Sequence, residues 1–312
     1  MNINKDEILN VLFNAISQIN ESKSLSISQA KEAFYHSLKR KNNNSDTIQY
    51  YKNIFCRVDK FFIENDIQQT NQINDSVLNL LIDECLDLNL SANYINKLIS
   101  GIKYMIKTLS EQNLIDSVNF KVKKLKVPEK RLDIIESDIL KTIFQFIETQ
   151  DLKTHLVVSM LLVTGLRRKE LSLIKINNIS LFDNSILIED SKTKVVRTIF
   201  FPIELNNTIT SYLKAYKPKT YLFEKETRGV PIEPRTITRI LNKIKVCLNL
   251  EKLSAHQFRH TFGTIIYEAS KDIELTRQLL GHSNYVMTKR YVHHSKDKLK
   301  SQYEKFNPLK SL

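Results

Sequence analysis

The chain has 312 residues and a mass of 36.5 kDa, more than one compact core usually holds, so we expect two domains. A mean hydropathy of −0.29 and the lack of a long apolar run argue against a membrane span. The three cysteines, Cys56, Cys85 and Cys247, are far apart in the chain. They exclude a disulfide scaffold and a Cys-rich zinc site and suit a reducing compartment, so a cytoplasmic protein without a secretory signal is expected.

The charge of the chain points to a polyanionic partner. Lys and Arg number 47 and Asp and Glu 34, which gives a net charge of +13. Residues 1–118 carry 12 basic and 14 acidic side chains, so their net charge is −2, whereas residues 119–312 carry 35 and 20, a net of +15. Nucleic acid is the first partner that such a surplus favours, and an acidic membrane surface the second. A basic surface that is merely solvated is the alternative.

Residues 1–118 are predicted to form a bundle of four or five helices. Apolar residues recur there at helical spacing, and a run of three asparagines at 42–44 interrupts the pattern. The predicted helices are, in chain order, Asp6–Ile19, Gln29–Arg40, a long helix that Ser45 or Asp46 caps, Ser76–Leu86, and a helix that begins at a Ser91 cap and runs through Ile106.

Residues 119–134 are predicted to be a basic linker between the two domains. The segment KVKKLKVPEKR has no helical apolar face and surrounds a proline. It either lies along DNA phosphates as a cationic strap or is a solvated tether, and both interpretations stay open. The lysines that would contact DNA are Lys121, Lys123, Lys124 and Lys126.

Residues 135–312 combine helices with a small sheet. The polar segment Asp190–Lys194 separates two β-rich runs, Ser185–Glu189 and Val195–Phe201, which predicts a hairpin. The predicted fold class is therefore mainly α with a small β-sheet: a helical N-terminal bundle followed by an α+β domain. The predicted helices of the second domain are Ser137–Glu148, Thr154–Val163, Pro234–Leu248, His256–Ser270 and Asp272–Leu280.

Two of the five glycines directly follow predicted helices and precede polar residues. Gly165 and Gly281 are expected to end their helices with a positive φ and to turn the chain sharply. These two glycines either serve only to end their helices, or they also direct the side chains of Arg167 and His282 into one site. A third feature, the pair His256 and Arg259, lies at i, i+3 and therefore on one helix face.

Five motifs occur in order over residues ~135–295: TGLRRKEL, SKT in the hairpin, HQFRHTF, LLGHS and KRYVHH. This series resembles the catalytic signature of the tyrosine site-specific recombinases, the phage integrase family. The N-terminal half is similar only in being helical, as a SAM-like core-binding domain that contacts DNA would be. The resemblance implies that residues 135–312 form the catalytic domain with its C-terminal tail. In chain order, the catalytic positions that the resemblance assigns are Arg167, Lys192, His256, Arg259, His282 and Tyr291.

The resemblance implies DNA cleavage by transesterification through a 3′-phosphotyrosine. A phenol has a pKa of about 10, so Tyr291 needs a base or a cationic site, and His256 can accept its proton directly or through a neighbour. Arg167, which Glu170 would buttress, Arg259 and His282 would stabilise the charge on the phosphate. Lys192, or its neighbour Lys194, would protonate the departing 5′ oxygen. Because arginines neutralise the phosphate and the phosphotyrosine keeps the bond energy, no metal, ATP or other cofactor is expected.

The partners implied by the resemblance are double-stranded DNA with a specific site and three further copies of the chain, a homo-tetramer on two DNA sites. A second recombinase or an accessory DNA-binding protein is a further partner that the family uses, and no membrane is expected. The C-terminal segment KDKLKSQYEKFNPLKSL either docks into a neighbouring protomer or caps its own domain. Integration of a mobile element and Xer-type separation of DNA dimers stay open. The alternatives are relaxation of the type IB topoisomerase kind and a non-catalytic DNA-binding regulator.

Overall fold

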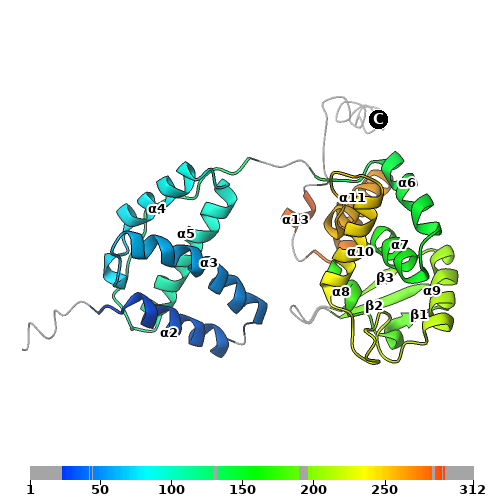
Figure 1. Ribbon diagram of the computed structural model, residues 1–312, viewed down its shortest axis with the longest axis horizontal. Coiled ribbons are helices and arrows are strands. Elements are labelled where there is room, and N and C mark those ends of the chain that lie inside the picture. Colours follow the sequence, from blue (N-terminus) through cyan, green and yellow to red (C-terminus); the bar gives the residue numbers. More distant parts are fainter. Residues whose placement is uncertain are drawn as a thin grey trace, which may run out of the picture. The chain divides into compact units, whose positions relative to one another are not determined.

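The chain divides into two compact units, Met1–Glu129 and Lys130–Leu312 (Figure 1). A computed structural model describes residues 23–41, 43, 45–128, 132–189, 196–282, 285–289 and 291. Over these residues helices dominate and a three-stranded sheet accompanies them, which confirms the predicted fold class. None of the described helices is both long and apolar enough to span a bilayer.

The first unit is a helical bundle built around α5 (Ala92–Glu111), against which the three other long helices pack. Ser91 caps α5 as predicted, because its Oγ accepts a hydrogen bond from the backbone N of Tyr94 at 3.3 Å. Phe34 is fully buried and makes edge-to-face contacts with the rings of Phe55 and Tyr104. The predicted helix at residues 6–19 lies outside the described residues. The other helices of this unit are α2 (Ile27–Arg40), α3 (Ser45–Glu64), the 3-10 turn η1 (Thr70–Gln72) and α4 (Asp75–Asp87).

The basic segment after α5 remains attached to the first unit instead of leaving it at once. The Asp75 carboxylate accepts hydrogen bonds from backbone N–H groups of this segment, including that of Val122, and Lys103 Nζ donates to the Val122 carbonyl at 2.6 Å. The Asn96 side chain bonds both backbone groups of Leu125, each at 2.8 Å. The predicted linker therefore lies on the helical unit through Leu125.

The second unit is organised around α7 (Leu152–Thr164), which is apolar on nearly all sides. Asp151 caps this helix by accepting a hydrogen bond from Thr154 N at 2.9 Å. Helices α6 (Ser137–Glu148), α9 (Ile203–Tyr216) and α11 (Ala255–Ser270) pack against it. A helix that is apolar all round is stable only when neighbours cover every face, so α7 is the core helix of this unit.

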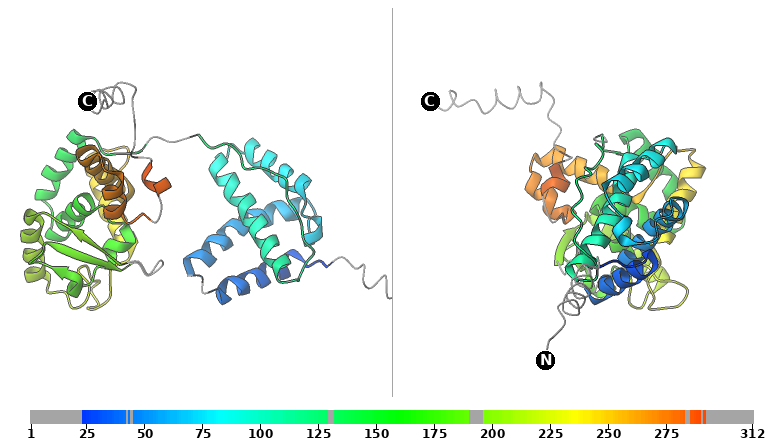
Figure 2. Two further views of the ribbon diagram at one scale, coloured as in Figure 1. Left: turned by 180° about the vertical axis from the view of Figure 1, so that it is seen from behind. Right: turned by 90° about the vertical axis from the view of Figure 1, so that its left-hand side faces the viewer.

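The sheet is antiparallel in the order β1-β2-β3, and its strands lie side by side (Figure 2). Its buried face carries Ile186 opposite Ile199, which lie in the main core of the unit. The predicted turn at residues 190–195 lies outside the described part of the chain. The strands are β1 (Ile179–Ser180), β2 (Ser185–Glu189) and β3 (Val196–Phe200).

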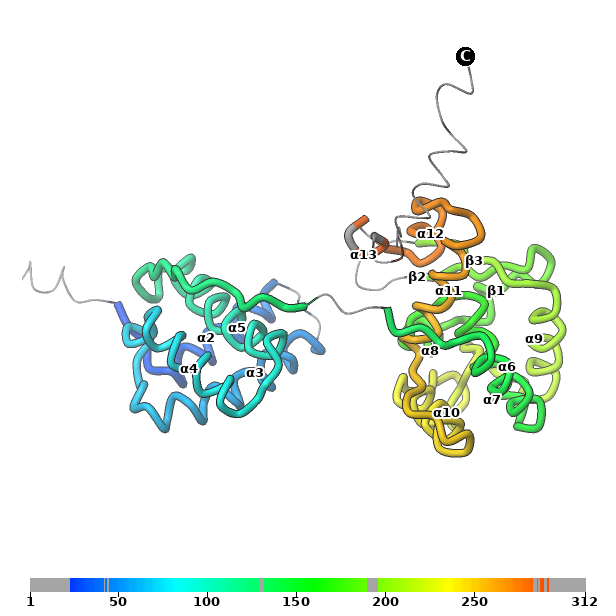
Figure 3. Tube along the Cα trace, turned by 90° about the horizontal axis from the view of Figure 1, so that it is seen from above, coloured from blue at the N-terminus to red at the C-terminus, as the bar shows by residue number. Residues whose placement is uncertain are grey.

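Four further helices and a 3-10 turn complete the described part of the second unit. Helix α12 packs against α11 and against α13, as Figure 3 also shows. Those helices that were predicted with both bounds and that the structure describes agree with the observed ones within about two residues, the usual uncertainty of helix ends. The elements are α8 (Arg168–Ser172), the 3-10 turn η2 (Ile176–Asn178), α10 (Pro234–Cys247), α12 (Ile273–Leu280) and α13 (Tyr285–Lys289).

The attachment of the basic segment can be tested with Asn96→Asp. This change removes the amide donor to the Leu125 carbonyl and places a carboxylate against it, at a cost of about 1–2 kcal/mol. We expect trypsin to cut after the lysines at 121–126 about tenfold faster, measured bond by bond with mass spectrometry. Asn242→Asp, at an exposed position of α10 in the second unit, is the control, and equal cleavage of the two variants would contradict the contact.

Candidate active site

The end of α7 turns the chain sharply and places Arg167 at the start of α8. Gly165 has a φ of +59°, and a Cβ there would lie 2.3 Å from the ring of Phe262, so glycine is required. Glu170, three residues into the next turn, accepts hydrogen bonds from the backbone N and from the Nη1 of Arg167, both at 2.8 Å. The turn and the carboxylate together set the direction of the Arg167 side chain.

A second guanidinium binds the same carboxylate. Arg197 on β3 donates from Nη1 and Nη2 to the two oxygens of Glu170, each at 3.0 Å. Burial alone would raise the pKa of Glu170, but the hydrogen bonds and charge of Arg197, followed by those of Arg167, outweigh burial and lower it. Glu170 is therefore an anion at every working pH.

Arg259 is the most deeply buried cation of the site, with 3% of its surface exposed. It lies on α11 and donates to the carbonyls of Gly165 at 2.7 Å and Leu280 at 2.5 Å, at the ends of α7 and α12. Burial, followed by the positive charge of Arg167, lowers the pKa of Arg259 to about 10. The side chain is still a cation at neutral pH.

His282 directly follows the end of α12, where Gly281 has a φ of +64°. The imidazole is buried, and its Nδ1 lies 2.9 Å from the hydroxyl of Thr288. Arg277 Nη1 donates to the His282 carbonyl at 2.8 Å. Backbone and ring are thus both held, which fixes the direction of the second ring nitrogen.

Tyr291 lies in this cluster, with 4% of its surface exposed. Its ring packs against Gly263, where a Cβ would lie 2.7 Å from the ring, and is nearly parallel to the ring of His282, with 6.4 Å between centroids. The phenol oxygen is 3.2 Å from Nδ1 of His260. Leu280, whose carbonyl accepts a hydrogen bond from Arg259, packs in the same apolar cluster as Tyr291.

The histidine next to the phenol is His260, which our sequence analysis did not assign. His256 lies one helical turn earlier on α11, in an exposed position, and its ring meets that of His260 edge-on at 5.2 Å. The spacing of four residues between the two histidines was the available signal. His256, the proton acceptor predicted from the sequence, thus lies beside the histidine that meets the phenol.

The structure therefore brings Arg167, Arg259, His282 and Tyr291 to one end of the second unit. Lys192 and Lys194 lie outside the described residues. The four lysines expected to contact DNA are exposed on the first unit: Lys121, Lys123, Lys124 and Lys126.

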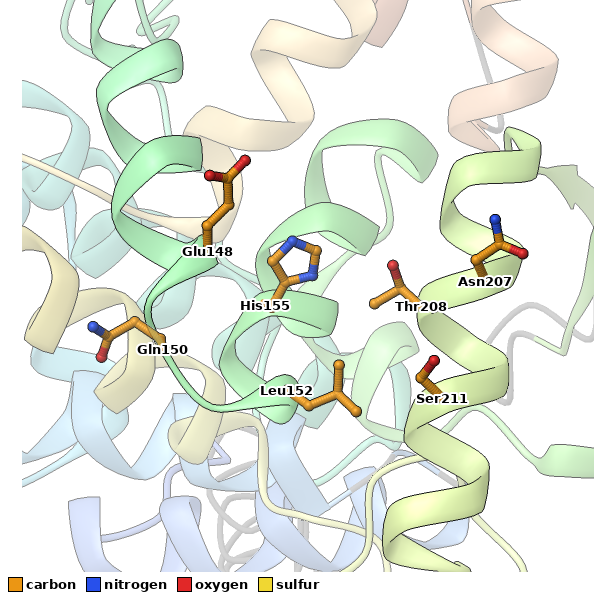
Figure 4. A pocket seen from close by; sticks show the side chains of 7 residues that line it. All are labelled: Glu148, Gln150, Leu152, His155, Asn207, Thr208 and Ser211. Carbon is orange, nitrogen blue, oxygen red and sulfur yellow. The ribbon is translucent and has the colours of Figure 1, made fainter.

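A pocket of 360 Å³ in the second unit is separate from this cluster (Figure 4). It lies at the start of α7, whereas Gly165 and the arginines lie at the end of that helix. None of the predicted site residues lines it. Its lining is Glu148, Gln150, Leu152, His155, Asn207, Thr208 and Ser211.

The sequence of this chain is similar to those of known proteins. Residues 133–298, more than half of the chain, match the family model described as the phage integrase family. The tyrosine recombinase XerC of Bacillus subtilis (strain 168) is 28% identical over 243 residues, 73% of this chain and 79% of that protein. XerC of Bacillus licheniformis is 27% identical over 284 residues, 86% of this chain and 92% of that protein.

A solved structure shows the same fold. The Tn1549 transposon integrase, in complex with transposon right end DNA, superposes with a TM-score of 0.73 at 17% identity, over 89% of this chain and 99% of that one. The family match covers the whole cluster of arginines, histidines and Tyr291. This chain therefore belongs to the phage integrase family and is a tyrosine recombinase, an enzyme that transfers DNA strands.

Proposed function

We propose that this chain is a site-specific recombinase that cleaves and rejoins DNA through a 3′-phosphotyrosine at Tyr291, without a metal or ATP. The observation that carries the proposal is the position of the phenol, 3.2 Å from Nδ1 of His260 and in one apolar cluster with Leu280, to whose carbonyl the buried Arg259 donates. A nucleophile, a proton acceptor and fixed positive charge are the components that phosphoryl transfer from an ester requires.

The first step is attack by the phenol oxygen on the scissile phosphorus. His260 accepts the phenol proton at Nδ1 and His256 assists it, while a new bond joins Tyr291 to the phosphorus. The bond from phosphorus to the 5′ oxygen breaks, and Lys192 supplies the proton that leaves with the 5′-hydroxyl. Attack by a 5′-hydroxyl from a partner strand reverses these steps and joins the exchanged strands.

The negative charge of the five-coordinate phosphate is met by groups that are already held. Arg167 has 35% of its side chain exposed and so faces the solvent from which DNA arrives. Arg259 and His282 are buried and fixed by carbonyls and by Thr288. Donors that need no rearrangement are the most effective in a transition state.

We propose that the DNA partner is a duplex with a specific site and that four copies of the chain act on two such sites. The net charge of +15 over residues 119–312 supports a nucleic-acid partner, because released counterions favour binding. The exposed lysines of the basic segment would contact phosphates and so position the duplex. The C-terminal segment, residues 296–312, would dock into the neighbouring protomer.

The similarity to XerC proteins along most of both chains supports an Xer-type reaction at a core site. In a decisive test, the protein is incubated with nicked duplexes that contain a randomised segment. The DNA that stays attached to the protein in detergent is then recovered and sequenced. One enriched sequence is the expected result. Attachment to all sequences alike would indicate a topoisomerase-like enzyme, and enriched binding without attachment would indicate a regulator.

The nucleophile is tested by Tyr291→Phe, which removes the oxygen that forms the covalent bond. We expect no covalently attached DNA on a denaturing gel. The variant should still bind the duplex that the randomised-segment test recovers (the captured duplex) with the affinity of the wild type. Tyr267→Phe is a matched control, because Tyr267 is buried in the same cluster. Covalent attachment by the Tyr291→Phe protein would contradict the assignment.

Arg167→Ala removes one preorganised donor and should slow attachment by about 100-fold, which corresponds to about 3 kcal/mol of barrier. The rate is measured at saturating DNA so that binding does not contribute. Arg168→Ala, which removes an exposed neighbour bonded to Thr238, should leave the rate nearly unchanged. Equal rates for the two variants would refute the role of Arg167.

His260→Ala removes the direct partner of the phenol and should slow attachment by about 100-fold. His256→Ala should have a smaller effect, since His256 reaches the phenol through His260. Single-turnover rates at saturating DNA separate the two variants. An unchanged rate for His260→Ala would show that another group accepts the proton.

A further inference from the structure

Arg197 is a buried arginine at the centre of the site to which the motifs assign no role. It lies on β3, whereas its partner Glu170 belongs to α8, 27 residues earlier in the chain. Only 11% of its side chain is exposed, compared with 35% for Arg167. A charged group is rarely buried to this degree unless it is paired, and Arg197 is paired at two atoms.

Arg197 is poorly accessible to a phosphate, because only 11% of its side chain is exposed. Two of its five N–H donors bond to Glu170, and Nε is buried without a hydrogen-bond partner among the described residues. The guanidinium also lies against Gly281, where a Cβ would come within 2.7 Å of Nε, Cζ and Nη1. Arg197 is thus enclosed between Glu170 and the end of α12, and any effect on the reaction passes through its neighbours.

The neighbour through which it acts is the carboxylate of Glu170. One oxygen accepts from Nη1 of both arginines, and the other accepts from Arg197 Nη2 and from the backbone N of Arg167. Four hydrogen bonds use the acceptor positions of a carboxylate fully. Without Arg197, half of these bonds disappear at a buried group, and the carboxylate is free to rotate away from Arg167.

We propose that Arg197 is a positioning residue that sets the direction of the Arg167 guanidinium through the carboxylate of Glu170. The proposal rests on the proposed function, since it concerns how Arg167 meets the scissile phosphate. It also makes the site depend on three elements at once, because Arg197 joins β3 to the start of α8 and to the end of α12.

The test compares Arg197→Gln, Glu170→Gln and the double variant on the captured duplex. Arg197→Gln should slow covalent attachment at saturating DNA by about 100-fold, the effect of a small misplacement of a catalytic group, while the dissociation constant for DNA stays nearly the same. The double variant should be no slower than Glu170→Gln, because both changes interrupt one path. Lys175→Gln, which removes an exposed ion pair at β2, is the control and should match the wild type.

Arg197→Lys keeps the charge but not the two parallel donors, so it should slow attachment by about tenfold. If Arg197→Gln does not fold, as judged by the absence of a cooperative thermal unfolding transition, Arg197→Lys replaces it in the comparison. Two results would overturn this inference and leave the proposed function intact. One is a wild-type rate of attachment for the Arg197 variants, and the other is a double variant whose fold-loss in rate is the product of the two single fold-losses. A wild type that attaches to no DNA would overturn the proposed function and this inference together.

Discussion

The site depends on one buried carboxylate that two arginines share. Arg167 and Arg197 share this carboxylate, and the positive charges of both act on the buried Arg259. Without Glu170 their mutual repulsion in a poorly solvated region would drive them apart. Glu170 offsets part of this repulsion and leaves a positive excess. This net positive charge attracts an anion that enters the site, and a DNA phosphate is the anion on which this family acts.

The backbone contributes to the same arrangement through the ends of two helices. The last carbonyls of a helix lack partners within it, and chain reversal at glycine leaves them accessible. Arg259 donates to the carbonyl of Gly165 and to that of Leu280, next to Gly281. The same bonds satisfy the helix ends and hold the arginine, so contacts that complete the fold also position a residue of the site.

Much of the fold was predictable because its signals are local. Helix α6 and strand β2 agree with the prediction at both ends, since apolar periodicity and turn residues define them. Helices α8 and α13 are five residues long, too short for a period to be visible. Helix α9 was also missed, because its asparagine and threonine residues have weak helix propensity and packing on α7 stabilises it instead.

The sequence by itself determined the class of enzyme, because the motifs around Arg167, Arg259, His282 and Tyr291 are short, ordered and rich in chemically specific side chains. Only the tertiary structure decided which groups these residues meet. Arg197 and Glu170 are 27 residues apart, and the histidine at the phenol lies 31 residues before it. Contacts at such separations arise when helices and strands pack together, and no periodicity along the chain records them.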